Sequence, residues 1–126
     1  MDWNPVSISI TKEFRFDAAH FLPTAPKGHP NSRMHGHSFA VALTLKGELD
    51  PVKGWVRDFG DVEQALGNLR ERLDHHLLNE IAGLELPTLE RIALFIFDDL
   101  KAVLPQIECV TVRRDSLGES CSYRRG

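Results

Sequence analysis

Two stretches of the chain alternate between apolar and polar residues, which is the pattern of a β-strand with one buried face. In the first stretch one parity is apolar apart from Lys12, and its members are Val6, Ile8, Ile10, Phe14, Phe16 and Ala18. The second stretch begins at His35, and its apolar parity comprises Phe39, Val41, Leu43 and Leu45. A loop rich in proline and glycine, from Pro23 to about Arg33, lies between them, and a turn over 47–54 follows. We therefore expect two strands that are able to pair as a hairpin.

The middle of the chain has the three- and four-residue spacing of amphipathic helices. The first apolar stripe comprises Phe59, Val62, Leu66, Leu69 and Leu73, with Asp58 or Asp61 available as a cap. The second helix is expected to begin at Pro87–Thr88 and to end before Pro105, and its stripe comprises Leu89, Ile92, Ala93, Ile96, Leu100 and Val103. Val110 and Val112 indicate a third strand, and 120–124 a short fourth. This order predicts an α+β domain, a four-stranded antiparallel sheet with two helices on one face.

Length and composition fit one globular domain over residues 1–126. The hydrophobic fraction of 42% and the charged fraction of 26% are ordinary, which argues against disorder. A formal charge of −3 gives no reason to expect a nucleic-acid or membrane partner. The sequence has no long apolar run and no basic-then-apolar signal at its N-terminus. Its two cysteines cannot make a disulfide framework, so the cytoplasm is the simplest expected location.

Three histidines fall on the inward parities of the two predicted strands. His35 and His37 share the parity of Phe39, and alternate residues of a strand point the same way with Cα atoms roughly 7 Å apart. His20 continues the inward parity of Phe16. In a hairpin these imidazoles meet at one end of the sheet, and three nitrogen ligands with an open fourth position are typical of catalytic zinc. The alternative is that each is a hydrogen-bonded core residue, and the pattern alone leaves both open.

A second polar cluster lies where the first predicted helix ends, and it contains Asp74, His75, His76 and Asn79. An aspartate beside a histidine can orient the imidazole and raise its basicity, as a general base requires. The structural alternative is that the histidines sit there because a helix C-terminus favours cationic side chains. The spacing does not decide between these two interpretations.

Six motifs then follow one another in a familiar order: FDAAH at 16–20, MHGHS at 34–38, GWVRDF at 54–59, LDHHLLN at 73–79, PTLE at 87–90 and YR at 123–124. With them the chain resembles the 6-pyruvoyl-tetrahydropterin synthase family over nearly its whole length. Within that family it is most similar to the bacterial queuosine-pathway branch, the 6-carboxytetrahydropterin synthases.

The resemblance implies the tunnelling fold, in which sheets from several subunits close into a barrel with sites between subunits, here a homohexamer of two trimers. It implies that His20, His35 and His37 bind Zn²⁺ and that Asp74 and His75 transfer protons. The implied substrate is the pterin 7,8-dihydroneopterin triphosphate, whose side-chain hydroxyls the metal would hold and help to deprotonate. Triphosphate and acetaldehyde would be lost, leaving 6-carboxytetrahydropterin for queuosine (7-deazaguanine) biosynthesis.

One departure from the family pattern concerns proton transfer. The family branch has a cysteine four residues before the first histidine of H-G-H, and that position is Asn31 here; a related branch has a glutamate at the position of Ser32. Neither an amide nor a free serine hydroxyl takes a proton near neutral pH. His29 and Cys121 are possible replacements, although a solvated loop histidine and a structural cysteine are the simpler interpretations. Cys109 is expected to pack as a small hydrophobe.

The second departure concerns the pterin ring. The family has a glutamate on the third strand that accepts hydrogen bonds from the ring, and the aligned residue here is Arg114, which offers donors only. Asp115 would need a one-residue slip, which turns a side chain to the other face unless a bulge corrects it. The following segment is one residue longer than the family's, so Glu119 is a third candidate. Arg114, Asp115 and Glu119 are the predicted substrate-binding residues, although Arg114 could instead pair with a carboxylate or phosphate of a different ligand.

These features favour a zinc-dependent lyase of the 6-carboxytetrahydropterin synthase type. The alternatives are an enzyme that keeps the metal but catalyses a different reaction, and a non-catalytic pterin-binding protein. Retention of Asp74 and His75 favours an enzyme, because binding alone does not require a proton-transfer pair.

Overall fold

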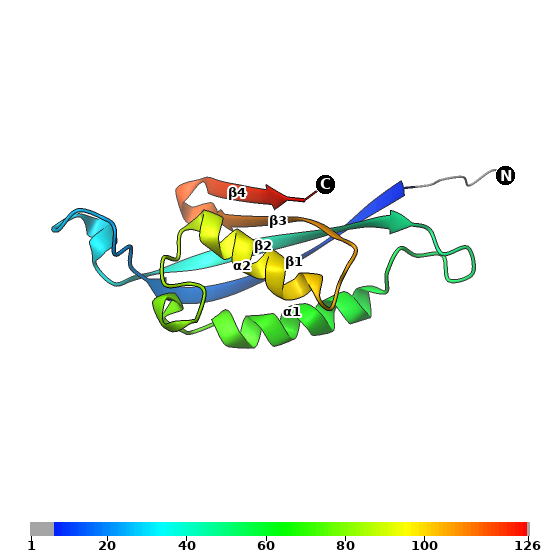
Figure 1. Cartoon of the computed structure of the whole chain (residues 1–126), viewed down its shortest axis with the longest axis horizontal. Coiled ribbons are helices and arrows are strands. Elements are labelled where there is room, and N and C mark those ends of the chain that lie inside the picture. Colours follow the sequence, from blue (N-terminus) through cyan, green and yellow to red (C-terminus); the bar gives the residue numbers. More distant parts are fainter. Residues whose placement is uncertain (1–6, 126) are drawn as a thin grey trace.

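The sheet and the two helices have the predicted order. The computed structural model describes residues 7–125, and Val6, which was expected to begin the first strand, lies outside them. Four antiparallel strands follow the order β1-β2-β3-β4, and both helices lie on one face (Figure 1). The elements are β1 (Ser7–His20), β2 (His35–Glu48), α1 (Phe59–Leu73), α2 (Leu89–Lys101), β3 (Ile107–Arg114) and β4 (Glu119–Arg124). The predicted fold class is confirmed.

The long β1–β2 hairpin follows the predicted parities. Phe16 pairs with Phe39, and their rings stack with centroids 5.0 Å apart. Both are buried under the helices, whereas the alternate residues face outward. Lys12, the exception to the apolar parity, is half-buried beside Glu63 of α1, where its aliphatic stem can lie along the helix.

The helices bury the expected stripes apart from one residue of each. Asp58 caps α1 by accepting from the Gly60 N–H, but Phe59 is 47% exposed because it is the first residue of the helix. Thr88 caps α2, which ends at Lys101, so the prediction that Val103 continues the stripe is wrong; Val103 is 55% exposed. The first helix packs along β1, and the second packs along β3 and β4.

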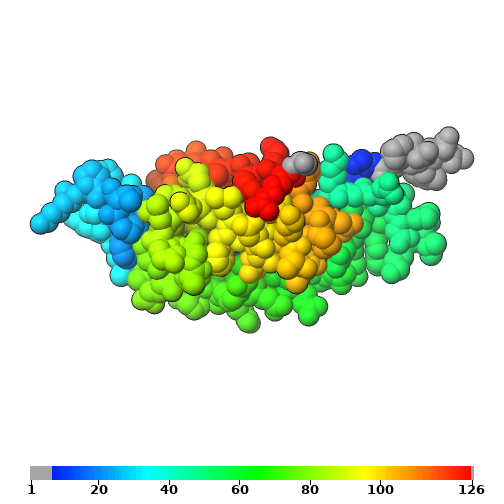
Figure 2. All heavy atoms as spheres, viewed as in Figure 1, coloured from blue at the N-terminus to red at the C-terminus, as the bar shows by residue number. Residues whose placement is uncertain are grey.

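Two loops extend from opposite ends of the molecule (Figure 2). The loop between β1 and β2 contains a 3₁₀ turn at Pro30–Ser32, as part of the predicted 23–33 segment. The loop at the other end joins β2 to α1, and β2 continues to Glu48, further than expected. Gly47 packs closely there, because a Cβ on it would lie 3.0 Å from the Gln106 side chain. A short 3₁₀ turn, Asp115–Leu117, joins β3 to β4. Among the described residues, neither helix has the length and apolar character that crossing a membrane requires.

Candidate metal centre and active site

The hairpin register brings the three predicted histidines together. His20 pairs directly with His35, and His37 pairs with Ala18. The His20 ring centroid lies 4.6 Å from that of His35 and 5.0 Å from that of His37. One ring nitrogen from each of the three lies within 4.8 Å of the others. The two-residue strand period and the antiparallel pairing therefore converge the imidazoles at one end of the sheet, as the sequence predicted.

Backbone carbonyls orient two of these rings. Nδ1 of His20 lies 2.9 Å from the Pro87 carbonyl oxygen, and Nδ1 of His35 lies 2.8 Å from that of Arg33. A carbonyl only accepts, so both Nδ1 atoms carry the proton and donate it, which leaves each Nε2 with a free lone pair. Nε2 of His20 is buried and has no hydrogen-bond partner among residues 7–125. A metal ion can serve as the partner of such an atom, and a histidine whose other ring nitrogen donates to a backbone carbonyl is the usual form of a metal ligand.

Burial favours the neutral form of two of these histidines, His20 and His37. Burial lowers the pKa of His20 to about 4, although the hydrogen bond to the Pro87 carbonyl raises this pKa. Burial also lowers the pKa of His37, and the nearby Arg114 guanidinium lowers it further. Neutral imidazole is the form that binds a metal ion, so these residues fit zinc, whose preferred ligands include three histidines.

The Asp74–His75 pair forms a turn that is tied to β1. Asp74 is the C-cap of α1, and His75 Nδ1 donates to Asp74 Oδ2 at 2.8 Å. The Asp17 N–H donates to the other oxygen, Asp74 Oδ1, at 2.9 Å, and this bond is the main reason that the pKa of Asp74 is lowered. The His75 N–H in turn donates to the Asp17 carbonyl oxygen at 2.6 Å. His75 holds a left-handed φ of 59°, which is uncommon for a residue other than glycine.

An open depression of about 540 Å³ contains both His37 and His75. Its walls include Gly36 and Ser38 of β2 and Asp17 of β1. The His75 side chain is 79% exposed, which leaves Nε2 accessible to a ligand in this depression. One member of the histidine cluster, His37, and the carboxylate-oriented imidazole of His75 therefore line the same ligand-sized space. That combination suits proton transfer at a metal-bound substrate.

The three predicted substrate-binding residues separate onto two faces of the sheet. Arg114 follows the inward parity of β3 and forms an ion pair with Glu119 of β4, its direct partner in the register. Asp115 instead lies on the outward face, where it accepts from Arg15 at 3.0 Å and Arg113 at 2.9 Å. Asp115 therefore lies on the face opposite to that of the three histidines, and its role in substrate binding stays a prediction. Arg114 and Glu119 remain candidates.

Comparison with known proteins identifies the family. The sequence model described as 6-pyruvoyl tetrahydropterin synthase matches residues 9–126. The chain belongs to this family. A 6-carboxy-5,6,7,8-tetrahydropterin synthase of Bacillus subtilis is 32% identical over 129 residues, covering 96% of this chain and 88% of the relative. A dihydroneopterin monophosphate aldolase of Pyrococcus furiosus is 37% identical over 108 residues, 86% of each chain.

A solved structure shares the fold. The 6-pyruvoyl tetrahydropterin synthase of Caenorhabditis elegans superimposes with a TM-score of 0.86 at 23% identity, covering 99% of this chain and 100% of that one. The predicted tunnelling-fold subunit is therefore confirmed. The predicted family and the prediction of an enzyme of the lyase class are also confirmed, at the level of the relatives' names.

This family member has no thiol where the family resemblance expects one. In the loop, His29 caps the 3₁₀ turn, since its Nδ1 accepts from the Asn31 N–H at 3.1 Å, and Asn31 itself is exposed. Cys109 is buried in β3, as expected for a small hydrophobe. Cys121 is half-buried in β4, and burial, followed by nearby Glu90, raises the pKa of its thiol. A raised pKa disfavours the thiolate, so Cys121 is a poor replacement for the missing group.

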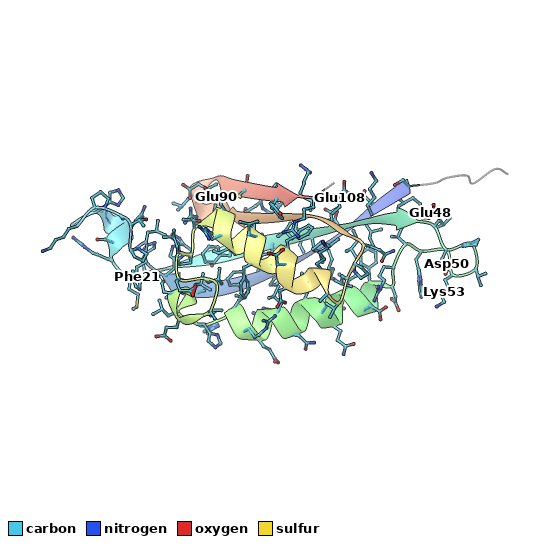
Figure 3. All side chains as sticks on the ribbon, viewed as in Figure 1. Phe21, Glu48, Asp50, Lys53, Glu90 and Glu108 are labelled. Carbon is cyan, nitrogen blue, oxygen red and sulfur yellow. The ribbon has the colours of Figure 1, made fainter. Side chains whose placement is uncertain are left out.

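Sequence reasoning missed residues that act on the site through backbone groups. Asn79 donates to the Phe21 carbonyl oxygen at 2.9 Å and accepts from the Phe21 N–H at 3.0 Å, and so fixes the end of β1 next to His20. Figure 3 labels Phe21 at this end of the strand. Pro87 contributes only its carbonyl oxygen. Asn79 belongs to the LDHHLLN motif, but its side chain could be assigned this role only once the fold was known.

Proposed function

We propose that the protein is a zinc-dependent lyase of the 6-carboxytetrahydropterin synthase type, which converts 7,8-dihydroneopterin triphosphate in queuosine biosynthesis. The observation that carries the proposal is the cluster of three histidines, in which Nε2 of His20 has no partner among the described residues. One of the three, His37, lines a depression that His75 also lines. The names of relatives such as the Bacillus subtilis synthase support the substrate class.

Each group of the site has a distinct task in this proposal. His20, His35 and His37 hold the Zn²⁺ ion, which when bound polarises a substrate oxygen and lowers the pKa of a hydroxyl. Asp74 keeps the proton of His75 on Nδ1, so that Nε2 of His75 accepts a proton from the substrate side chain. The same imidazole returns that proton at a neighbouring carbon, as the side chain rearranges and triphosphate leaves.

The family relationship and the resemblance together also support an assembly. We expect a cytoplasmic homohexamer in which the sheets of neighbouring subunits close a barrel. In that arrangement the exposed side of the His75 depression would be covered by another subunit. The formal charge of −3 gives no reason to expect a nucleic-acid or membrane partner.

A second candidate function is carbon–carbon cleavage of the pterin side chain, as an aldolase catalyses. The residue that favours it is Asn31, which leaves the loop without the acid–base group of the 6-carboxytetrahydropterin synthase branch. The Pyrococcus furiosus relative is named as an aldolase acting on dihydroneopterin monophosphate. Removal of a hydroxyl proton by one base is sufficient to start such a cleavage, and His75 can provide it. A binding protein without catalysis is the remaining alternative.

The test is to incubate zinc-loaded protein with 7,8-dihydroneopterin triphosphate and, separately, with the monophosphate, and to identify products by mass spectrometry. Formation of 6-carboxytetrahydropterin supports the first proposal. A 6-hydroxymethyl pterin with a two-carbon fragment would establish the aldolase instead. Neither product, from protein whose zinc content is verified, would leave only the binding function.

A further inference from the structure

Arg70, in the last turn of α1, joins β1 to the turn that holds His75. Its Nε donates to the Arg15 carbonyl oxygen at 2.8 Å. Its Nη2 lies 3.3 Å from Oδ2 of Asp74, the residue that caps the helix. The Asp74 N–H in turn donates to the backbone carbonyl oxygen of Arg70 at 2.7 Å. Because two of its nitrogens have partners, the guanidinium is held between the strand and the carboxylate.

Donors surround the Asp74 carboxylate. Its side chain is only 15% exposed. Oδ1 accepts from the Asp17 N–H at 2.9 Å, whereas Oδ2 is shared by Nδ1 of His75, at 2.8 Å, and Nη2 of Arg70. The Asp17 bond is the main cause of the lowered pKa of Asp74, followed by the His75 bond, and the charge of Arg70 acts in the same direction. Asp74 is therefore an ionised group that contacts both a cation and the imidazole.

The charge of Arg70 changes the effect of this carboxylate on His75. An aspartate and a neutral imidazole alone carry a negative charge, which protonation of the ring cancels. With Arg70 the same group begins neutral and becomes positive, so that uptake of a proton is less favourable and its return is easier. A base that must also return its proton requires such a balance, because an imidazolium that is too stable is a poor acid.

Other charged groups near this turn do not provide the same contact. The titratable or charged residues around the Asp74–His75 pair, from its own segment and from β1 and β2, are Arg70, His76, Arg15, Asp17 and His37. Arg15 and Asp17 have side-chain partners elsewhere, Asp115 and Ser38. Among residues 7–125, Arg70 is the one lysine or arginine that forms an ion pair with Asp74.

We propose that Arg70 is a positioning residue for His75, which fixes the Asp74 carboxylate against Nδ1 of His75 and compensates its negative charge. Arg70 does not line the depression that His75 lines, so it acts on the imidazole through Asp74. This inference rests on the proposed function for the proton-transfer role of His75. The compensation of charge can be measured without turnover.

The first test follows proton uptake by the His75 ring in the full-length, zinc-loaded protein, from the pH dependence of its NMR signals, assigned with His75→Ala. In Arg70→Met the ring is expected to take up its proton at a pH about half a unit or more above that of the wild type, because removal of a nearby cation stabilises the imidazolium. Arg70→Lys keeps a positive charge beside Asp74 but lacks the Nε donor to β1. It is expected to restore most of the wild-type behaviour.

The second test is kinetic. Arg70→Met is expected to lower kcat roughly tenfold and to leave the KM for 7,8-dihydroneopterin triphosphate nearly unchanged, because the substrate contacts remain while His75 returns its proton less readily. A merely structural role would instead lower zinc content or the melting temperature. If Arg70→Met does not fold by circular dichroism, Arg70→Gln removes the charge, keeps an N–H donor and is expected to give the same two results.

Arg72→Met is the matched control. Arg72 is the other basic residue in the last turn of α1, and its side chain pairs with Asp99 of α2. Its removal therefore deletes an arginine and an ion pair from the same turn without touching Asp74. The variant is expected to keep the wild-type result in both tests.

The inference fails if the His75 ring takes up its proton at the same pH in the wild type and in the neutral variant, or if Arg72→Met or Arg70→Lys shifts that pH as far as Arg70→Met does. It also fails if Arg70→Met raises KM and leaves kcat unchanged. A wild-type protein without turnover would reject the proposed reaction, and the NMR result would still decide whether Arg70 compensates the charge of Asp74.

Discussion

The histidine cluster and the Arg114–Glu119 pair lie on the same face of one sheet, but they are built from different interactions. The histidines are held by strand pairing and by backbone carbonyls, and burial keeps His20 neutral. The other pair consists of two charged side chains at a hairpin turn, and its orientation depends on ion pairs on the opposite face. The first region depends mainly on strand pairing, whereas the second depends on the length of one turn.

This difference indicates how the two regions can change in evolution and in experiments. A register of two 14-residue strands is difficult to alter without losing the core, so the positions of the three histidines are fixed with the fold. A turn of four residues between Arg114 and Glu119 tolerates one residue more or less, and such a change replaces the side chains on the inward face at this end of the sheet. The histidine cluster and the Arg114–Glu119 pair can therefore vary independently.

The largest expected effect is loss of the metal from His20→Ala. Two imidazoles cannot hold zinc as three do, so zinc affinity should fall by at least roughly 100-fold, beyond what loss of an outer-shell contact causes. The measurement is zinc content after dialysis, by mass spectrometry of the metal. Glu119→Gln should retain full zinc, because it belongs to the other region, and so should His29→Ala in the loop. Loss of zinc from either control would mean that the two regions are not independent.

The second effect concerns catalysis without metal loss. Since His75 is proposed to move the proton, His75→Ala should lower kcat by about 10²- to 10⁴-fold. Its zinc content should be unchanged. His76→Ala is the control, because the Nδ1 of His76 donates only to the Asp74 carbonyl oxygen, at 2.8 Å. Equal losses in the two variants would contradict a specific role for His75.

A smaller effect links helix capping to the metal centre. Thr88 caps α2 directly after Pro87, whose carbonyl orients His20. Thr88→Ala should lower the free energy of unfolding by about 1 kcal/mol, measured by urea denaturation. It should also weaken zinc binding by roughly 3- to 10-fold, through a less well-fixed Pro87. Asp58→Ala removes the cap of α1 and should cost similar stability without any change in zinc affinity.

The smallest effect is the pH dependence of the outward ion pairs. The hydrogen bond from Arg113, and secondarily the one from Arg15, lowers the pKa of Asp115. A carboxyl group with a lowered folded-state pKa stabilises the fold above its unfolded pKa of about 3.9, and this contribution is lost as pH falls through the folded value. The melting temperature of Asp115→Asn should therefore be slightly below that of the wild type at neutral pH. The melting temperatures of the two proteins should converge as the pH falls. A difference that grows in acid would contradict the stabilising role of the ionised Asp115.

The sequence predicted the first region well and the second only as alternatives. Parity alone placed His20, His35 and His37 on one face, because a hairpin needs only two strands and one register. At the other region, the alignment with the family placed Arg114 on the third strand but could not choose between Asp115 and Glu119. That choice depends on a 3₁₀ turn and on a contact between Asp115 and Arg15, one hundred residues apart in the chain.

Helix periodicity had a similar limit. It found both stripes but extended the second to Val103, because an apolar residue just beyond a helix end can keep the three-residue spacing of the stripe. The left-handed backbone of His75 and the hydrogen bonds of Asn79 to Phe21 could not be predicted from the local sequence. Both depend on where β1 lies relative to the 74–79 segment.

The most direct test of the account is zinc K-edge X-ray absorption of the purified, zinc-loaded protein. The structure predicts one zinc ion with three imidazole nitrogens at about 2.0–2.1 Å and one additional light atom in the open position. A sulfur scatterer at about 2.3 Å would mean that Cys109 or Cys121 is a ligand. That result, or fewer than three imidazoles, would contradict the assignment of His20, His35 and His37 as the metal site.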